Sequence, residues 1–134
     1  MLASGVRFTM VGLNVTHEAL VTPEVRRRIA AIGNATSAFG AELLDFFCAT
    51  NDEVFGLPDG PLHDPVAVAV LAAPDAVRTV FTHLDVEVVG VHTAGATLVD
   101  LDGMLDRPAN AHVAVGLDVP RFWDAVEAAI ARLA

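Results

Sequence analysis

Two neighbouring side chains that could do acid–base and metal chemistry, His63 and Asp64, stand directly before an apolar run at residues 66–73. Histidine can give up a proton near neutral pH. Asp64 precedes Pro65, so we expect it to cap the N-terminus of a helix, with its second oxygen free to face a cation. The same residue types also suit a plain helix cap and a loop histidine. Both interpretations stand at this level.

An acidic segment at residues 100–107 carries carboxylates at Asp100, Asp102 and Asp106 and ends on the positive charge of Arg107. A calcium loop of the EF-hand type also needs an acid at its twelfth position, and Ala111 stands there. We therefore interpret this segment as a turn that faces solvent.

Two histidines lie close to acidic residues, but neither pair completes a zinc site. His17 precedes Glu18, and His83 is two residues before Asp85. Zinc sites of proteins use three or four ligands in a closed set, and no further ligands follow at suitable spacing. We interpret the first pair as the entry of a helix and the second as the surface of a strand.

Charge and composition exclude several classes of partner. The formal net charge is -9 and the chain has no lysine, whereas nucleic-acid binding needs a basic face. The one basic cluster, at residues 26–28, fits the solvated face of a helix. The chain contains no run of 18 apolar residues, so the sequence predicts no membrane-spanning helix. Cys48 is the single cysteine, which rules out an internal disulfide and favours the cytoplasm.

The elements that must position His63 can be predicted in outline. We expect a short strand over residues 7–13. A helix should begin at Thr22, whose hydroxyl can cap it, and end at residues 33–34. A second helix over 37–49 carries a stripe of Phe39, Leu43, Phe46 and Phe47, which predicts a core-facing side. A loop over 51–62 leads to a helix that is apolar all round, which indicates burial.

The second half of the chain is rich in strands. Residues 77–91, 97–101 and 111–119 have strand composition, and a closing helix runs from residue 120 to 134. This order predicts one mixed α/β domain over residues 1–134. The first strand has no partner close in sequence, so it needs a neighbour from elsewhere in the chain or from a missing segment.

The stretch around His63 resembles the C-terminal signature of the inosine/uridine-preferring nucleoside hydrolases. The resemblance rests on collinear segments: Phe55-Gly56-Leu57, Gly60-Pro61-Leu62-His63-Asp64-Pro65, and residues 8–17, 83–87, 97–100, 108–115 and 121–124. It implies the C-terminal portion of a Rossmann-like open mixed sheet with flanking helices, with the N-terminal half of the family fold absent. Two residues depart from the pattern: Asn14 stands where aspartate is usual, and Ala94 where arginine is frequent.

The resemblance also implies a reaction, which is hydrolysis of the N-glycosidic bond of purine or pyrimidine ribonucleosides. In this family a bound Ca²⁺ activates the attacking water. Carried over, Asp64 would be a calcium ligand and a ribose contact. His63 would be the acid for the leaving base or a base contact, and Phe55 would lie in a mobile loop against the nucleobase.

The family's acidic cluster and its ribose clamp are missing at their expected positions, the clamp falling just upstream of residue 1. One carboxylate cannot hold a cation that takes six to eight oxygen ligands. We therefore expect a hydrolase lineage that is inactive as this chain alone. The alternatives are a non-catalytic remnant that acts as an oligomerising or binding module, and an unrelated small module. Cut strand edges and open apolar faces predict a homo-oligomer, and the base preference stays open.

Overall fold

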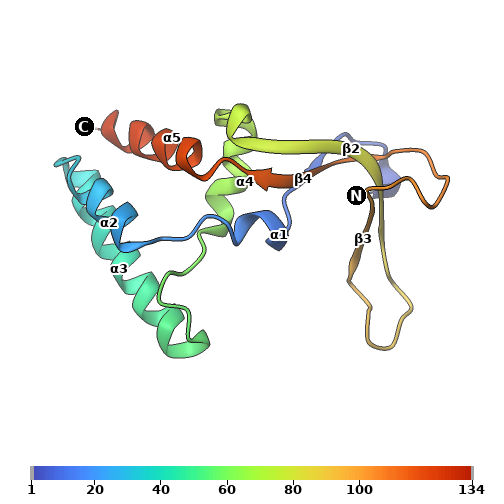
Figure 1. Cartoon of the computed structure of the whole chain (residues 1–134), viewed down its shortest axis with the longest axis horizontal. Helices are drawn as coiled ribbons and strands as arrows, with labels where there is room; N and C mark the ends of the chain where they lie inside the picture. Colours follow the sequence, from blue (N-terminus) through green and yellow to red (C-terminus); the bar gives the residue numbers. More distant parts are fainter. Residues whose placement is uncertain (1, 134) are drawn as a thin grey trace.

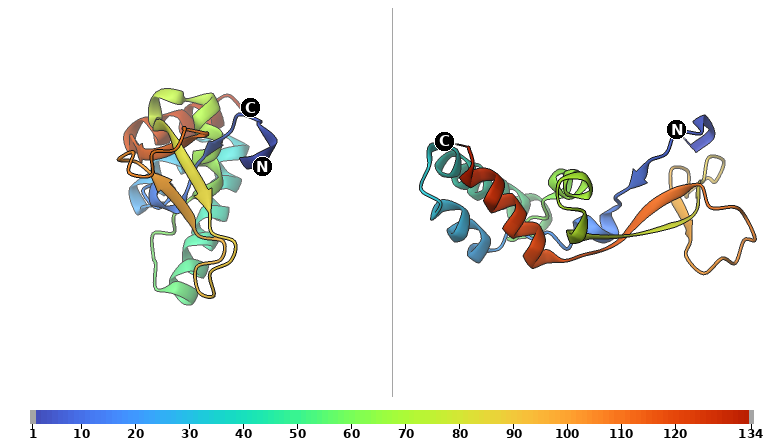
Figure 2. Two further views of the ribbon diagram at one scale, coloured as in Figure 1. Left: turned by 90° about the vertical axis from the view of Figure 1, so that its right-hand side faces the viewer. Right: turned by 90° about the horizontal axis from the view of Figure 1, so that it is seen from above.

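The computed structural model describes residues 2–133 and shows an elongated molecule with helices at one end and a β-hairpin at the other (Figures 1 and 2). Its helices are α1 (Leu13–Thr16), α2 (Pro23–Ala30), α3 (Ala35–Phe55), α4 (His63–Ala72) and α5 (Val119–Ala131). Its strands are β1 (Thr9–Met10), β2 (Val77–Val86), β3 (Thr97–Asp100) and β4 (Ala111–Leu117). Short 3₁₀ turns occupy Leu2–Ser4 and Pro74–Ala76.

The four strands form one mixed sheet in the order β1-β4-β2-β3. β1 runs parallel to β4, and the β4–β2 and β2–β3 pairs are antiparallel. The first strand thus finds its partner far along the chain, where Thr9 pairs with His112 and Met10 with Val113. The mixed α/β sheet with flanking helices confirms the predicted fold class. The predicted strand over 77–91 ends earlier, at Val86, because residues 87–96 form the hairpin turn.

The first predicted helix start is confirmed. The Thr22 hydroxyl accepts the backbone N–H of Val25 at 3.3 Å, and Pro23 occupies the first helical position. The arginines of α2 fix this helix to its neighbours, because Arg26 pairs with Asp45 of α3 and Arg28 with Asp124 of α5. The basic cluster is therefore an ion-paired helix face.

α3 is longer than predicted, and most of its apolar stripe does not face the core. The helix continues through residues 51–55, which we expected to be part of a loop, and Gly56 caps its end with a φ of 67°. Phe39 and Phe46 of the stripe are 67% and 70% exposed, while Phe47 packs against the core. The buried side chains of this helix are instead Ser37, at 0% exposure, and Cys48, at 2%.

Two predictions about α4 are wrong. The helix begins at His63 with Leu62 at the N-cap, so Asp64 lies within the first turn and does not cap it. The apolar sequence does not make the helix buried all round either. Val66 is fully buried, whereas Leu71 is 86% exposed.

The principal core lies between the helices and the adjoining ends of β2 and β4. It centres on Phe122, Ile29 and Val15, with Trp123 stacked edge-on against Phe122 at a centroid distance of 5.0 Å. A smaller cluster of Leu84, Ala111 and Val113 lies further along the sheet. The principal core therefore holds α1 and α4, the two helices that carry the candidate site.

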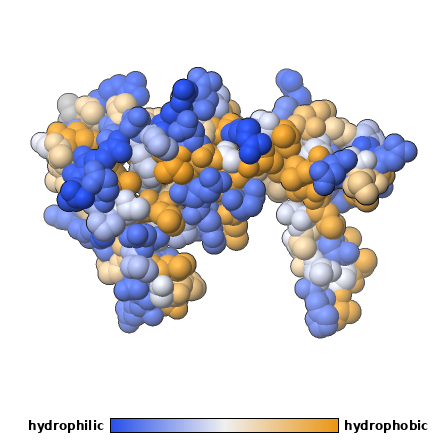
Figure 3. Space-filling view, viewed as in Figure 1, coloured by the Kyte–Doolittle hydropathy of each residue, from blue (hydrophilic) through white to orange (hydrophobic). Residues whose placement is uncertain are grey.

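Much apolar surface stays open at both ends of the molecule (Figure 3). The tip of the β2–β3 hairpin exposes Val88, Val89 and Val91, and the end of α3 exposes Val54 and Phe55. Isolated exposed apolar residues are ordinary, but contiguous patches usually mark surfaces that contact other protein. No helix within residues 2–133 has the length and apolar character needed to cross a membrane.

Candidate active site

The start of α4 is fixed beside α1 by a short backbone strap. Leu20 and Pro61 form an antiparallel bridge. The amide of Val21 donates to the carbonyl of Gly60 at 3.1 Å, and the amide of Leu62 donates to that of Ala19 at 2.9 Å. Buried backbone groups require such partners, so the strap sets the distance between the end of α1 and the start of α4.

The strap places His63 against the last residue of α1. His63 Nδ1 lies 2.7 Å from Thr16 Oγ1, and the two residues form a hydrogen bond across 47 positions of sequence. The ring of His17 lies 5.3 Å from the His63 ring, tilted by 47°. Thr16 is 4% exposed, and His63 is half-buried. One nitrogen of the imidazole is thus held, while the ring retains access to solvent.

Asp64 lies beside this histidine in the first turn of α4 and is exposed. Its side chain makes no hydrogen bond or ion pair within residues 2–133, so both oxygens are free to accept. The N-terminal turn of a helix favours a negative charge. Asp64 also borders an apolar cavity of about 420 Å³ between α4 and α5, whose wall includes Phe122 and Val126. Its carboxylate is therefore available to a ligand.

Phe55, the third predicted site residue, is not in a loop. It is the last residue of α3 and is 69% exposed. Among the residues that the structure describes, its ring stacks on neither His63 nor His17. His63 and Asp64 are neighbours in the first turn of α4, where His63 contacts Thr16 of α1 and Asp64 borders the cavity beside α5, whereas Phe55 lies at the end of α3.

The described carboxylates do not converge on a cation. Within residues 2–133, no group of three or more His, Cys, Asp or Glu side chains could hold a metal ion. The acidic segment after β3 is a turn, as predicted, because the Asp100 carboxylate accepts the amides of Met104 and Leu105 at 2.7 and 2.9 Å. These residues alone do not fit Ca²⁺, which takes six to eight oxygens.

His83 is a buried ionic centre and not the strand-surface residue we predicted. It is 8% exposed, its Nδ1 donates to the carbonyl of Pro108 at 2.9 Å, and its Nε2 donates to Asp85 at 3.1 Å. The Pro108 and Asp85 bonds raise the pKa of His83, and the bond from His83 lowers the pKa of Asp85. Arg107 pairs with the same carboxylate. The cluster fastens the loop after β3 to β2.

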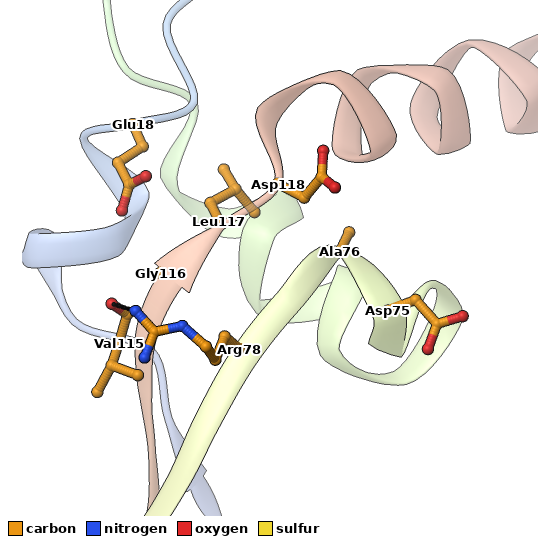
Figure 4. A pocket seen from close by; sticks show the side chains of 8 residues that line it. All are labelled: Glu18, Asp75, Ala76, Arg78, Val115, Gly116, Leu117 and Asp118. Carbon is orange, nitrogen blue, oxygen red and sulfur yellow. Dashed lines mark hydrogen bonds between the residues drawn. The ribbon is translucent and has the colours of Figure 1, made fainter.

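A polar hollow of about 530 Å³, which His63 does not line, lies at the junction of β2, β4 and α5 (Figure 4). The Arg78 guanidinium crosses it and donates to the carbonyl of Val115 at 3.2 Å. The carboxylates on its rim, Glu18, Asp75 and Asp118, point in different directions (Figure 4), and Asp118 caps α5 by accepting the amide of Arg121. The hollow brings together no groups that could act on one substrate atom.

Sequence reasoning proposed the histidine and the aspartate as site residues but did not consider Thr16, which contacts the histidine. The residue is part of the segment that carries the family resemblance, yet nothing in its own neighbourhood points to position 63. The hydrogen bond exists because the strap joins residues 19–21 to residues 60–62. A local pattern cannot encode that contact.

Comparison with known proteins shows the family to which this chain belongs. A family model described as inosine-uridine preferring nucleoside hydrolase matches residues 1–124. The pyrimidine-specific ribonucleoside hydrolase RihA of Shigella boydii is 43% identical over 122 residues, which cover 90% of this chain and 39% of that protein. The pyrimidine-specific ribonucleoside hydrolase RihB of Shigella flexneri is 32% identical over 127 residues, 95% of this chain and 41% of that protein.

Solved structures agree on the fold. The purine-preferring ribonucleoside hydrolase from Gardnerella vaginalis superposes with a TM-score of 0.79 at 33% identity, covering 99% of this chain and 43% of that one. A plant nucleoside hydrolase superposes with a TM-score of 0.81 at 18% identity, covering 98% and 43%. The chain spans about two fifths of the length of the relatives it matches. With the family model matching most of its length, this chain belongs to the inosine-uridine preferring nucleoside hydrolase family.

Proposed function

We propose that this chain supplies the C-terminal part of a nucleoside N-ribohydrolase site, which cleaves the bond between ribose and the base of a purine or pyrimidine ribonucleoside. The observation that carries the proposal is the pairing at the start of α4. There a half-buried histidine, held through one nitrogen only, stands next to an exposed carboxylate with no partner among the described residues. Membership of the family supports the reaction class.

Each of the three candidate residues has a role in this proposal. Cleavage of an N-glycosidic bond leaves negative charge on the departing base, so His63 acts as the donor to that base. Asp64 accepts hydrogen bonds from ribose hydroxyls. Phe55 packs against the nucleobase, and its 69% exposure leaves the ring available for such a contact.

The three candidate residues would supply only part of a calcium site. When bound, Ca²⁺ lowers the pKa of a coordinated water. Within residues 2–133 Asp64 offers one carboxylate, and the remaining oxygens have to come from outside this set. We therefore propose that the isolated chain binds calcium weakly and does not turn over, and that activity appears when the rest of the site is supplied.

A complementation assay tests this function. The chain is mixed with the N-terminal three fifths of the RihA relative, and hydrolysis of uridine and inosine is followed with and without calcium. We expect activity only in the mixture with calcium, and loss of activity in His63→Ala and Asp64→Ala. His92→Ala and Asp102→Ala, which change exposed residues remote from α4, are the matched controls. Hydrolysis by the isolated chain would refute the incomplete-site proposal, and a mixture that stays inactive would refute the assigned function.

Calorimetric titration of the isolated chain with Ca²⁺ tests the metal separately. We expect no saturable binding at micromolar calcium. Tight binding that Asp64→Asn abolishes would show that this chain builds a full site, alone or across an assembly. A cytoplasmic location stays a prediction, supported by the single, buried thiol of Cys48.

We further propose that the chain self-associates, because its apolar surface is extensive at both ends. This apolar surface includes the exposed side chains of Leu71 on α4 and Val91 on the hairpin turn. Sedimentation velocity at micromolar concentration should show dimers or larger species. A single monomeric boundary across a tenfold concentration range would contradict self-association.

A further inference from the structure

Thr16 is a buried side chain to which the proposed chemistry assigns no role. It ends α1 between the buried Val15 and the exposed His17, and it is itself only 4% exposed. Its hydroxyl lies 2.7 Å from His63 Nδ1, a distance at the short end for a hydrogen bond to nitrogen. A contact this close fixes which atoms share a proton.

The direction of this hydrogen bond follows from the partners available. A hydroxyl has one hydrogen to donate, and burying it without an acceptor is unfavourable. Elsewhere in the chain the Thr50 hydroxyl donates to the carbonyl four residues earlier, at Phe46. Thr16 makes no such bond within the described residues. The His63 nitrogen is its one side-chain partner there, so the hydrogen goes from Thr16 Oγ1 to His63 Nδ1.

This direction determines the tautomer of the neutral imidazole. When Nδ1 accepts a hydrogen bond it carries no hydrogen, so the hydrogen of the ring is on Nε2. Nε2 makes no hydrogen bond to the protein within residues 2–133, and the ring is half-exposed. When the ring is protonated, Nε2 still carries a hydrogen, and the rotatable Thr16 hydroxyl turns to accept from Nδ1–H.

We propose that Thr16 is a positioning residue that holds His63 in the Nε2–H tautomer and directs Nε2 to the substrate. The proposal rests on the role of His63 as donor to the leaving base and adds how that role is secured. With Thr16 in place, Nε2 presents a hydrogen in both charge states of the ring. Without it, part of the neutral population would offer a bare Nε2, which cannot donate.

Nuclear magnetic resonance of the isolated chain tests the proposal without requiring any hydrolysis. Long-range ¹H–¹⁵N spectra report the tautomer of each imidazole, and His63→Gln assigns the His63 signals among the five histidines. Spectra are taken at about pH 9, well above the usual histidine pKa. We expect wild-type His63 to be predominantly Nε2–H.

Two substitutions separate the hydroxyl from the shape of the side chain. Thr16→Val keeps the shape and removes the hydroxyl. It should shift the tautomer ratio of His63 toward Nδ1–H by about two- to tenfold, the effect of one hydrogen bond of ordinary net strength. Thr16→Ser keeps the hydroxyl and should restore the wild-type ratio. Thr50→Val makes the same replacement at an exposed helix position, away from His63, and should leave the His63 signals unchanged.

Three results would overturn the assignment. These are a wild-type His63 that is mainly Nδ1–H, an unchanged ratio in Thr16→Val, and a serine variant that shifts as far as the valine variant. The first needs no variant, so the test survives even if Thr16→Val fails to fold. An inactive complementation mixture would refute the proposed hydrolase function and leave these spectra unaffected.

Discussion

Asn34 joins the ends of two helices through one side-chain amide. Its Oδ1 accepts the backbone N–H of Ser37 at 2.7 Å and caps α3. In return, Ser37 Oγ accepts the backbone N–H of Asn34 at 3.1 Å. Its Nδ2 donates to the carbonyls of Ile130 and Leu133, at 2.9 and 2.8 Å, where α5 ends. The oxygen satisfies the start of one helix and the nitrogen satisfies the end of another.

Two substitutions at Asn34 separate these contributions. Removing a side-chain N-cap costs about 1 kcal/mol. The two bonds to α5 are partly exposed, so we assign them about 1 kcal/mol together. Asn34→Ala loses both and should lower the free energy of unfolding by about 2 kcal/mol. Asn34→Ser keeps a good N-cap but cannot reach α5, so it should lose about 1 kcal/mol.

Urea unfolding followed by tryptophan fluorescence measures these losses. Trp123 is the single tryptophan, is 2% exposed, and lies on α5, so its emission reports the packing of that helix. Circular dichroism provides the second probe needed to establish two-state unfolding. Thr50→Ala on the exposed face of α3 is the control and should stay within about 0.5 kcal/mol.

Two outcomes for the stability of Asn34→Ser would contradict the roles assigned to Asn34. If Asn34→Ser is as unstable as Asn34→Ala, the cap of α3 contributes nothing. If Asn34→Ser matches the wild type, the bonds to the end of α5 contribute nothing. The predicted order places the serine variant between the other two.

Three further predictions use the same measurements. His83 has a raised pKa in the fold, so its contribution is complete below about 6.5, the usual histidine value, and is lost as the pH rises through the raised value; the urea midpoint should fall over that range in the wild type and not in His83→Gln. Phe122→Ala removes a fully buried ring from the principal core and should cost about 3–5 kcal/mol in urea unfolding. Val89→Lys changes a hairpin residue that is 86% exposed, so stability should change by less than about 0.5 kcal/mol while the sedimentation profile shifts toward monomer.

Local signals predicted the elements whose ends are set by local chemistry. Thr22 and Pro23 marked the start of α2 because the cap and the fixed φ of proline act within one turn. The end of α3 was misplaced, since Thr50 and Asn51 are residue types that favour loops. In the structure their side chains bond back to carbonyls four residues earlier, and the helix continues to the left-handed Gly56.

The burial of side chains and their contacts were harder to predict, because both depend on segments that are distant in sequence. The apolar sequence of α4 indicated a fully buried helix, but packing covers only the face that carries Val66 and leaves Leu71 in solvent. The family resemblance singled out His63, yet the hydroxyl that contacts it lies 47 residues earlier. Periodicity predicts on which face of a helix a side chain lies. Which other segments pack against that face depends on the whole fold.

The backbone strap between residues 19–21 and 60–62 allows the segment between them to vary in length. The two ends of the segment 22–59 lie close together, because Leu20 bridges Pro61 and the amide of Leu62 donates to the carbonyl of Ala19. Doubling the length of a closed loop costs only about 0.6 kcal/mol of entropy. Insertions and deletions at the junction of α2 and α3, or past the end of α3, therefore leave the spacing of Thr16 and His63 unchanged. An insertion at either place should therefore change the surface near His63 while the hydrogen bond between Thr16 and His63 is retained.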